Sequence, residues 1–290
     1  MRFSFAESMC DPSHYPTLVM EAERAGFHSF TVPDSLCYPE ESDSKYPYTP
    51  DGNREFLADK PFIEPFVMMA WLGALTERLR FTTFVVKLPT RNPLIIAKQA
   101  TSLACVLGPD RFGFGVGISP WPDDFRATGV PWKGRGKRMD EMMEILRGLF
   151  SGEFFGFKGE HFDIQRIKLC PVPDKPIPLL VGGHADAALR RAARLGDGWM
   201  HAGGGAASDL DAAIARLGEL RHEYGREKEP FEIHVISMDA YTTDGIKRLE
   251  DKGVTDAIVG FRNAYVADTM TVQQKVDALK GYADNVIAKL

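Results

Sequence analysis

Short segments rich in β-branched and aromatic residues alternate along this chain with longer segments of helical period, and the pair repeats eight times. That alternation is typical of β–α units, in which each strand is followed by a helix and the strands lie parallel. Eight consecutive units can close into a (β/α)₈ TIM barrel, and such barrels run to about 250 residues or more as one unit. We therefore expect residues 1–290 to form a single domain of this fold.

The expected strands are Arg2–Ala6, Ser29–Val32, Arg80–Val86, Arg111–Val116, Pro178–Val181, Gly198–His201, Glu232–Ser237 and Asp256–Gly260. The expected helices are Ser13–Ala25, Ile63–Thr76, Pro93–Leu107, Arg135–Phe150, Ala185–Leu195, Ser208–Tyr224, Asp244–Lys252 and Val272–Ala288. Proline is favoured in the first turn of a helix, and glycine is common just after the last turn. Pro93 and Gly108 agree with both preferences.

The turn after the first strand argues against a doubly wound sheet. A dinucleotide-binding sheet usually carries a glycine-rich phosphate fingerprint at that turn. Here residues 6–13 read AESMCDPS and contain no glycine. The closed barrel is therefore the better prediction.

Two loops are longer than a barrel requires, and a third insertion has a strand-like pattern. Residues 36–60 follow the second strand, and residues 118–134 follow the fourth. Long loops in compact domains are often functional, so we expect both to cover the C-terminal mouth of the barrel, with a plain surface insertion as the alternative. Residues 152–164 alternate aromatic and polar side chains, which predicts a hairpin before the fifth barrel strand.

Composition narrows the class of partner. The formal net charge is −5 and the 35 Lys and Arg residues are scattered, so we expect no nucleic-acid partner. The four cysteines include no C-x-x-C pair, which argues against a zinc cluster and for a reducing compartment. We find neither a signal-peptide pattern nor an apolar run long enough to span a membrane, so we expect a cytoplasmic protein that acts on a small molecule.

Three ordered motifs resemble the luciferase-like monooxygenase superfamily. Residues 78–121 read RLRFTTFVVKLPTRNPLIIAKQATSLACVLGPDRFGFGVGISPW, residues 135–150 read RGKRMDEMMEILRGLF, and residues 176–204 read PIPLLVGGHADAALRRAARLGDGWMHAGG. The resemblance implies a barrel that holds a flavin or deazaflavin and pairs as a homodimer. The RNP, GVG, GG and DGW elements look more like the branch that uses the deazaflavin coenzyme F420, with FMN as the alternative cofactor.

The resemblance also implies where the cofactor binds. The family carries a bulge at the position of Thr83, Phe84 and Val85, often with a non-prolyl cis peptide, here between Phe84 and Val85, behind the ring system. Gly117, Ile118 and Ser119 would contact the ring and the polyol chain. Gly113, Gly115 and Gly117 alternate along the fourth strand, a pattern that marks close approach of a ligand or of another backbone, and Gly113 is assigned a structural role.

Gly182, Gly183 and His184 stand between the fifth strand and the next helix. Glycines there expose backbone N–H groups, and a helix N-terminus adds partial positive charge, so the segment suits a phosphate group. A tight turn that needs positive φ is the alternative.

Asp34 and Ser35 are the catalytic candidates. Asp34 ends the second strand in the motif TVPDS, where the family match implies a hydrogen bond to the cofactor, although a loop or capping role is also open. Ser35 falls where several relatives have a catalytic histidine. Pro120 falls where the deazaflavin-dependent sugar-phosphate dehydrogenases place a glutamate, so that substrate class is disfavoured. Arg91, Arg135 and Arg138 are interpreted as parts of buried structural ion pairs, with anion sites as the alternative.

The substrate pocket is expected at the C-terminal ends of the strands, because barrel enzymes build their sites there. Aromatic side chains in the neighbouring loops could line the pocket or simply pack. The predicted pocket residues are Glu7, Tyr38, Trp121, Trp199 and His201, with Tyr46, Tyr48 and Trp132 as further aromatic candidates.

The leading hypothesis is hydride transfer between F420 and a small organic substrate, and the alternative is an FMN-dependent monooxygenase that uses reduced flavin and dioxygen. A metal-dependent hydrolase would want paired histidines on one strand, whereas the first strand offers Phe3, Ser4 and Phe5, so we expect no metal. A binding protein without turnover is the remaining alternative.

Overall fold

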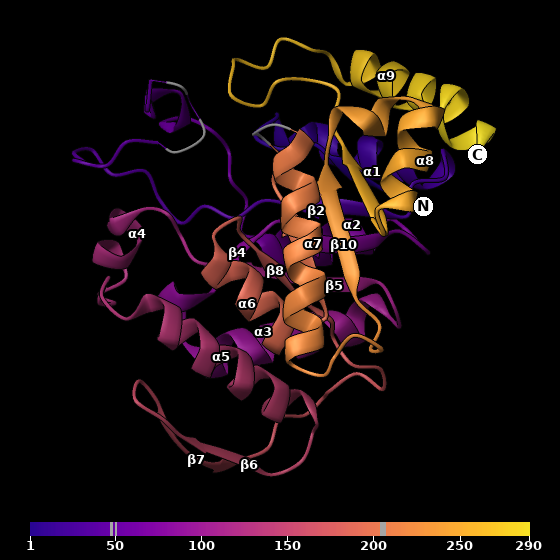
Figure 1. The fold of residues 1–290 in the computed structure, drawn as a ribbon. Helices are drawn as coiled ribbons and strands as arrows, with labels where there is room; N and C mark the ends of the chain where they lie inside the picture. Colours follow the sequence, from indigo (N-terminus) through magenta and orange to yellow (C-terminus); the bar gives the residue numbers. More distant parts are fainter. Residues whose placement is uncertain (47–48, 50, 204–206) are drawn as a thin grey trace.

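The computed structural model describes residues 1–46, 49, 51–203 and 207–290 (Figure 1). The described chain forms a closed parallel barrel, as predicted. Its strands follow one another in the order β3-β2-β1-β11-β10-β9-β8-β5-β4, and the pairing of β3 with β5 closes the ring. The barrel strands are β1 (Arg2–Ala6), β2 (Ser29–Val32), β3 (Arg80–Thr83) with β4 (Val86–Lys87), β5 (Phe112–Gly117), β8 (Leu179–Gly182), β9 (Gly198–His201), β10 (Glu232–Ile236) and β11 (Asp256–Val259).

The third barrel strand differs from its prediction. A continuous strand over 80–86 was expected, but pairing stops after Thr83 and resumes at Val86. The expected cis peptide between Phe84 and Val85 lies in this interruption and is confirmed. The apolar run looked continuous in the sequence because neither a glycine nor a proline marks the break.

The helices surround the strands (Figure 1). They are α1 (Tyr15–Arg24), α2 (Pro65–Gly73), α3 (Pro93–Leu107), α4 (Pro122–Ala127), α5 (Arg135–Phe150), α6 (Asp186–Leu195), α7 (Ala207–Glu223), α8 (Thr243–Asp251) and α9 (Val272–Asn285). α3 and α5 match their predicted bounds, and α4 was expected only as loop. Side-chain caps fix several helix starts: Asn92 accepts from the N–H groups of Leu94 and Ile95, and Thr271 forms a capping box with Gln274.

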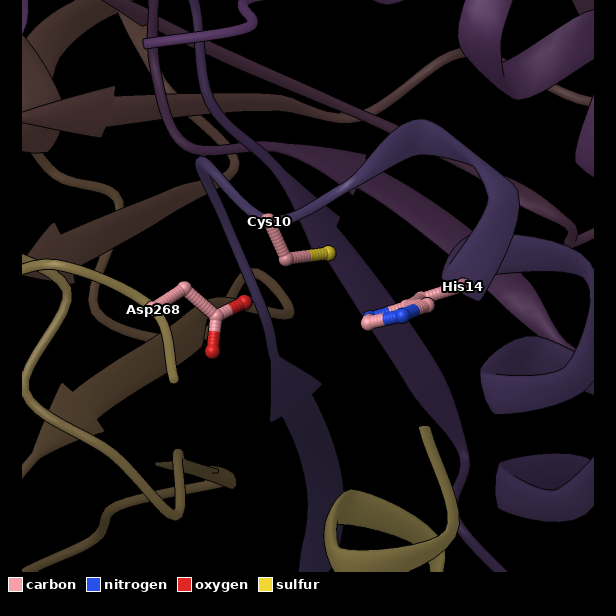
Figure 2. Close-up of side chains that lie close together, drawn as sticks. All are labelled: Cys10, His14 and Asp268. Carbon is pink, nitrogen blue, oxygen red and sulfur yellow. The ribbon is translucent and has the colours of Figure 1, made fainter. Parts of the chain in front are cut away.

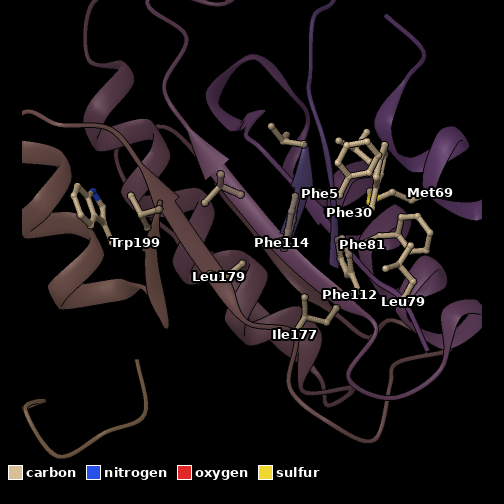
Figure 3. Close-up of a cluster of buried hydrophobic side chains, with 14 of the residues drawn as sticks. Phe5, Phe30, Met69, Leu79, Phe81, Phe112, Phe114, Ile177, Leu179 and Trp199 are labelled. Atoms are coloured by element: carbon tan, nitrogen blue, oxygen red, sulfur yellow. The ribbon is translucent and has the colours of Figure 1, made fainter. Parts of the chain in front are cut away.

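The main core lies between the barrel strands and the outer helices (Figure 3). Phe112 and Phe114 of β5 meet Phe66 of α2 with ring centroids 6.2 Å and 5.7 Å apart. A separate cluster fills the inside of the barrel with Leu180, Met200 and Ile258. The strands are therefore buried on both faces, which explains why they read as nearly continuous apolar runs in the sequence.

A charged cluster occupies the N-terminal end of the barrel. Arg80 donates two hydrogen bonds to Glu232, at 2.7 Å and 3.0 Å, and His234 Nε2 lies 2.8 Å from the same carboxylate. Burial would raise the pKa of Glu232, but the hydrogen bonds from His234 and Arg80 outweigh burial and hold this pKa well below its usual range. Gly113 has the expected structural role, because a Cβ there would lie 2.9 Å from Arg80 Nη2.

The predicted hairpin consists of β6 (Phe155–Lys158) and β7 (Asp163–Ile167), which pair antiparallel. It lies beside α5, at the bottom of Figure 1, and extends three residues beyond the predicted end. Among the described residues, no helix has both the length and the apolarity needed to cross a membrane.

Candidate active site at the barrel mouth

A cavity of about 560 Å³ opens at the C-terminal ends of the strands. Both long loops contribute to its lining, Tyr46 and Leu57 from residues 36–60 and Ile118 to Trp121 from residues 118–134. Its volume is in the usual range for small-molecule sites. The described part of the chain therefore places both loops at the mouth, as predicted.

The inner wall of the cavity is aliphatic and aromatic. Phe84, Val85, Met200, Ile236 and Ile258 line it, and the same side chains belong to the cluster that fills the barrel interior. A wall without charged groups suits one face of a planar ring system. Phe84 and Val85 thus lie where the sequence predicted the ring contact, although the contact itself stays a prediction.

Gly117 and Gly182 line the cavity and pack closely against Val85. A Cβ at Gly117 would lie 2.6 Å from Val85 Cγ2, and a Cβ at Gly182 would lie 3.0 Å from Val85 Cγ1. Val85 therefore fills the space that a side chain at either position would need, and the cofactor contacts of both glycines stay a prediction. Gly115 is equally constrained, because a Cβ there would overlap the carbonyl oxygen of Thr83.

The turn from β8 into α6 has the features of an anion site. Gly183 has φ +125°, a conformation that favours glycine. Ala185 is the N-cap residue of α6 and supplies no capping side chain. The first N–H groups of α6 therefore lack a side-chain acceptor, and the helix N-terminus carries partial positive charge.

Trp199 lies outside the cavity lining and is fully buried, so its predicted pocket placement is wrong. It points away from the mouth because its position in β9 faces the outer core. Its indole Nε1 donates a 2.8 Å hydrogen bond to the carbonyl oxygen of Gly183. The side chain thereby holds the turn that precedes α6.

His184 lines the cavity, and His201 lies behind it with the ring centroids 4.5 Å apart. His184 Nε2 accepts from the backbone N–H of Ala202 at 3.3 Å, and His201 Nδ1 accepts from the N–H of Gly203 at 3.1 Å. Burial and the nearby His184 lower the pKa of His201 to about 4, and burial also lowers the pKa of His184. Both rings are therefore neutral at pH 7. His201 was expected to line the pocket but is covered by His184.

Asp34 lies at the cavity with both carboxylate oxygens engaged. Oδ2 accepts from the backbone N–H of Lys87 at 2.8 Å, and Oδ1 accepts from Arg91 Nη2 at 2.7 Å. The expected ion pair of Arg91 is confirmed. Asp34 thus joins the end of β2 to the segment after β4, and Ser35 lines the cavity beside it.

The same expectation of an ion pair is wrong for Arg135 and Arg138, which have no carboxylate partner among the described residues. Arg135 packs on Trp132, and Arg138 donates to the carbonyl oxygen of Pro89.

Glu7 reaches the cavity from the end of β1. Its Oε1 accepts from Arg262 Nε at 2.5 Å and lies 3.6 Å from Lys275 Nζ. Arg262 also donates to the carbonyl oxygen of Ser8. Sequence reasoning missed Arg262, although its position just after β11 marks it as a residue at the C-terminal end of a strand.

Figure 2 shows Cys10, His14 and Asp268 close together. These residue types can ligate metals, but Lys275 occupies the same space. Its Nζ donates to Asp268 and lies 3.3 Å from His14 Nδ1. Burial raises the pKa of the Cys10 thiol to about 11, which disfavours the thiolate form that a metal would need. We assign this group to the support of Glu7.

Aromatic side chains surround the outer part of the cavity. The ring of Tyr46 lies 5.5 Å from that of Trp121 and 6.1 Å from that of Tyr265, and all three line the cavity. Tyr38 lies outside the lining, so its predicted place in the pocket is wrong: it packs against the cluster of Met9, Leu57 and Trp121, with the Arg54 guanidinium 4.7 Å from its ring centroid. Trp132 packs against Arg135 instead. Tyr48 falls outside the described residues.

Two other predicted cofactor contacts have internal partners. Thr83 is fully buried, lies outside the lining and donates to the carbonyl oxygen of Gly115 at 2.7 Å. It faces the neighbouring strand, so its expected place at the cavity is wrong. Ser119 lines the cavity, but its hydroxyl donates to Asp124, which also pairs with Lys87 Nζ at 2.8 Å.

Comparison with known proteins identifies the family of the chain. The family described as "Luciferase-like monooxygenase" matches residues 7–284. An uncharacterized protein of Mycobacterium tuberculosis (strain ATCC 25618 / H37Rv) is 60% identical over 292 residues, which is 100% of both chains. An F420-dependent glucose-6-phosphate dehydrogenase of Gordonia bronchialis is 28% identical over 255 residues, covering 86% of this chain and 70% of the relative.

Solved structures share the fold. An F420-dependent secondary alcohol dehydrogenase in complex with an F420-acetone adduct aligns with a TM-score of 0.75 and 18% identity, over 97% of each chain. The coenzyme F420-dependent tetrahydromethanopterin reductase of Methanopyrus kandleri aligns with a TM-score of 0.74 and 15% identity, over 99% of each chain. At these identities the likeness establishes the barrel and its connections.

Proposed function

Because this chain belongs to the luciferase-like monooxygenase family, we propose that it is an oxidoreductase that transfers a hydride between coenzyme F420 and a small organic substrate at the barrel mouth. The observation that carries the proposal is the pairing of an uncharged inner wall with an uncapped helix. Phe84 and Val85 lie on that wall, and α6 begins beside it after the turn at Gly183. A planar ring with a phosphate tail needs these two features together.

The described residues fit such a cofactor. The ring would lie against Phe84 and Val85, and its polyol chain would run past Asp34, Ile118 and Ser119. Gly182, Gly183 and His184 would contact the phosphate, where the open N–H groups of α6 and a neutral histidine can donate. When bound, the reduced deazaflavin would supply a hydride, which is equivalent to two electrons and one proton. A second proton, from another donor, would complete the reduction of a carbonyl to an alcohol.

The remaining residues would position the substrate and exclude water. Ser35 has a hydroxyl at the cavity and is the proposed group for proton transfer at the substrate oxygen. Asp34 acts as a positioning residue, because Arg91 and the Lys87 N–H already hold both of its oxygens. Arg262 holds Glu7 in place in the lining of the same cavity.

Sequence relatives support the choice of F420 over FMN, because two of them are F420-dependent glucose-6-phosphate dehydrogenases at 28% and 29% identity. FMN remains the alternative cofactor, for oxygenation with reduced flavin and dioxygen. Titration of the purified protein with F420 and with FMN, followed by calorimetry, tests the choice. We expect tighter binding of F420. Tighter binding of FMN would replace the proposed activity with the monooxygenase alternative.

We also propose that two copies of the chain pair through α2 and α3. These neighbouring helices expose Val67, Trp71, Ile95 and Val106, at 63%, 41%, 61% and 73%. Several large apolar side chains exposed on two neighbouring helices favour an interaction site there. We propose a two-fold symmetric dimer in which α2 and α3 of one copy pack against α2 and α3 of the other copy.

A further inference from the structure

The outer part of the cavity has aromatic walls and paired charges, whereas the inner wall has no charged groups. These features of the outer part indicate which substrate the site accepts. We infer that this outer part binds an uncharged compound with an aromatic body and one carbonyl or hydroxyl oxygen. The inference rests on the proposed function, since it names the substrate class of the same site. Three observations carry it: the aromatic walls, the pairing of every charged group in the lining, and two buried donors without a partner.

The walls come from three loops that meet only in the folded chain. Tyr46 follows β2, Trp121 follows β5 and Tyr265 follows β11. Their rings contact one another edge to face, with centroid distances of 5.5 Å and 6.1 Å from Tyr46. Leu57 and Phe62 extend the same apolar surface. Such a surface favours a flat apolar body, which can stack or meet the rings edge to face.

The charges in the lining compensate one another. Lys87 pairs with Asp124 at 2.8 Å, and Asp34 pairs with Arg91. Arg262 pairs with Glu7 at 2.5 Å and lies 3.8 Å from Asp268. Within the described lining, each cation thus already has a carboxylate partner. A phosphate or carboxylate on the substrate would have to displace one of these partners or be buried without a counter-charge, and both cost free energy.

Two buried donors in the described lining, from Trp121 and Arg262, are left for the substrate. Trp121 is 5% exposed, and its indole Nε1 has no hydrogen-bond partner within the described structure. A buried donor without an acceptor is costly, so a ligand oxygen that accepts from it gains affinity. Arg262 Nη1 is likewise buried without a partner, while the charge of its guanidinium is balanced by Glu7 and Asp268. A neutral oxygen satisfies either donor without adding charge.

The test compares four probes on the full chain with F420 added. Acetophenone has the aromatic body and the carbonyl oxygen, ethylbenzene lacks the oxygen, and 4-acetylbenzoate adds a carboxylate. Glucose 6-phosphate represents the substrate in the names of the curated relatives. We expect calorimetry to give the tightest binding for acetophenone. Tighter binding of 4-acetylbenzoate or glucose 6-phosphate would overturn the inference.

The variant Trp121→Phe removes the N–H group and keeps an aromatic ring. We expect about 3- to 10-fold weaker binding of acetophenone, as for one lost hydrogen bond, and a change below about twofold for ethylbenzene. Equal weakening of both probes would assign Trp121 to packing and overturn its role as a donor. Trp132→Phe is the matched control, since Trp132 packs on Arg135 away from the cavity.

F420 binding is measured separately in each protein. If the unaltered protein binds acetophenone but does not bind F420, the result would contradict the proposed function and leave the inferred substrate class unaffected. Normal F420 binding with a preference for glucose 6-phosphate would contradict the substrate class alone.

Discussion

The indole Nε1 of Trp199 donates a 2.8 Å hydrogen bond to the carbonyl oxygen of Gly183, which joins the outer core to the turn at the barrel mouth. Gly183 has φ +125°, and a Cβ there would lie 2.9 Å from Ala188 Cβ. The turn is therefore held by the hydrogen bond from Trp199 on one side and by the close packing of Ala188 of α6 on the other. This relationship connects a fully buried side chain to the proposed phosphate site.

Replacement of Trp199 by Phe removes that hydrogen bond. We expect a loss of about 1 kcal/mol in the free energy of unfolding from the hydrogen bond, with a further loss from the smaller ring. We also expect F420 affinity to fall several-fold, because the turn at Gly183 loses its support. Urea unfolding and F420 titration measure the two effects. If F420 affinity stays unchanged while stability falls, Trp199 supports the core alone.

Ala185 offers a test of the phosphate site that does not strain the turn, because it already has an extended backbone and no capping side chain. Ala185→Asp and Ala185→Asn should each raise the free energy of unfolding by about 0.5–2 kcal/mol as N-caps. Both should weaken F420 binding by occupying the N–H groups, and the aspartate more than the asparagine because it also repels the phosphate. If the two variants bind F420 equally well, repulsion between the aspartate and the phosphate does not contribute to the weaker binding.

Glu232 should make stability depend on acid pH. Its pKa is lowered in the folded chain, so its ion pairs contribute stability above about pH 4.5, the pKa of an unpaired glutamate. That contribution is lost as the pH falls through the folded pKa. We expect Glu232→Gln to cost about 3 kcal/mol at pH 7, and less below pH 4. Glu219→Gln is the control, because Glu219 forms only an exposed pair with Arg216.

His201 should titrate near pH 4 in the folded protein, because burial and the neighbouring His184 lower its pKa. NMR titration of the histidine rings measures this value directly. In the unfolded chain the pKa of this histidine is about 6.5. The free energy of unfolding is therefore unaffected by His201 above pH 6.5, and it falls as the pH drops from 6.5 toward 4, because the unfolded chain takes up the proton first. His184→Asn should raise the pKa of His201. A value near 6.5 in the unaltered protein would contradict the buried neutral pair.

The proposed pairing through α2 and α3 predicts a concentration-dependent dimer. Val67→Glu and Ile95→Glu place charges on the exposed apolar face, where Val67 is 63% and Ile95 is 61% exposed. We expect sedimentation to show a monomer for the double variant and a dimer for the unaltered chain, with little change in the helical content. A monomer in both cases would refute the pairing.

The strands and helices could be predicted to a large extent, because burial on both faces imposes a readable period. Four elements outside the regular pattern could not be predicted so well. The third strand breaks after Thr83, α4 forms inside an expected loop, and β7 runs on to Ile167. The C-terminal end of α9 also differs, since the helix ends at Asn285 and not at Ala288 as predicted. Each depends on local backbone geometry that no periodicity reports.

The candidate site could be predicted as a location more reliably than as a set of side chains. Position at the end of a strand predicted Glu7, Asp34 and the segment at Gly182 to Gly183. The same rule misplaced Trp199 and His201, because one residue along a strand decides whether a side chain faces the cavity or the outer core. Arg262 and Lys275 escaped prediction because only their contacts with Glu7 give them a role.

By itself, the sequence determined the repeat of strand and helix, and with it the barrel and the end at which its loops gather, since each buried strand must return through a helix. Only the tertiary structure decided which charges cancel. Glu7 and Arg262 are 255 residues apart in the chain, yet their atoms lie 2.5 Å apart at the cavity. Whether a carboxylate is free to bind a ligand depends on such a distance, and distance between remote residues is set by packing.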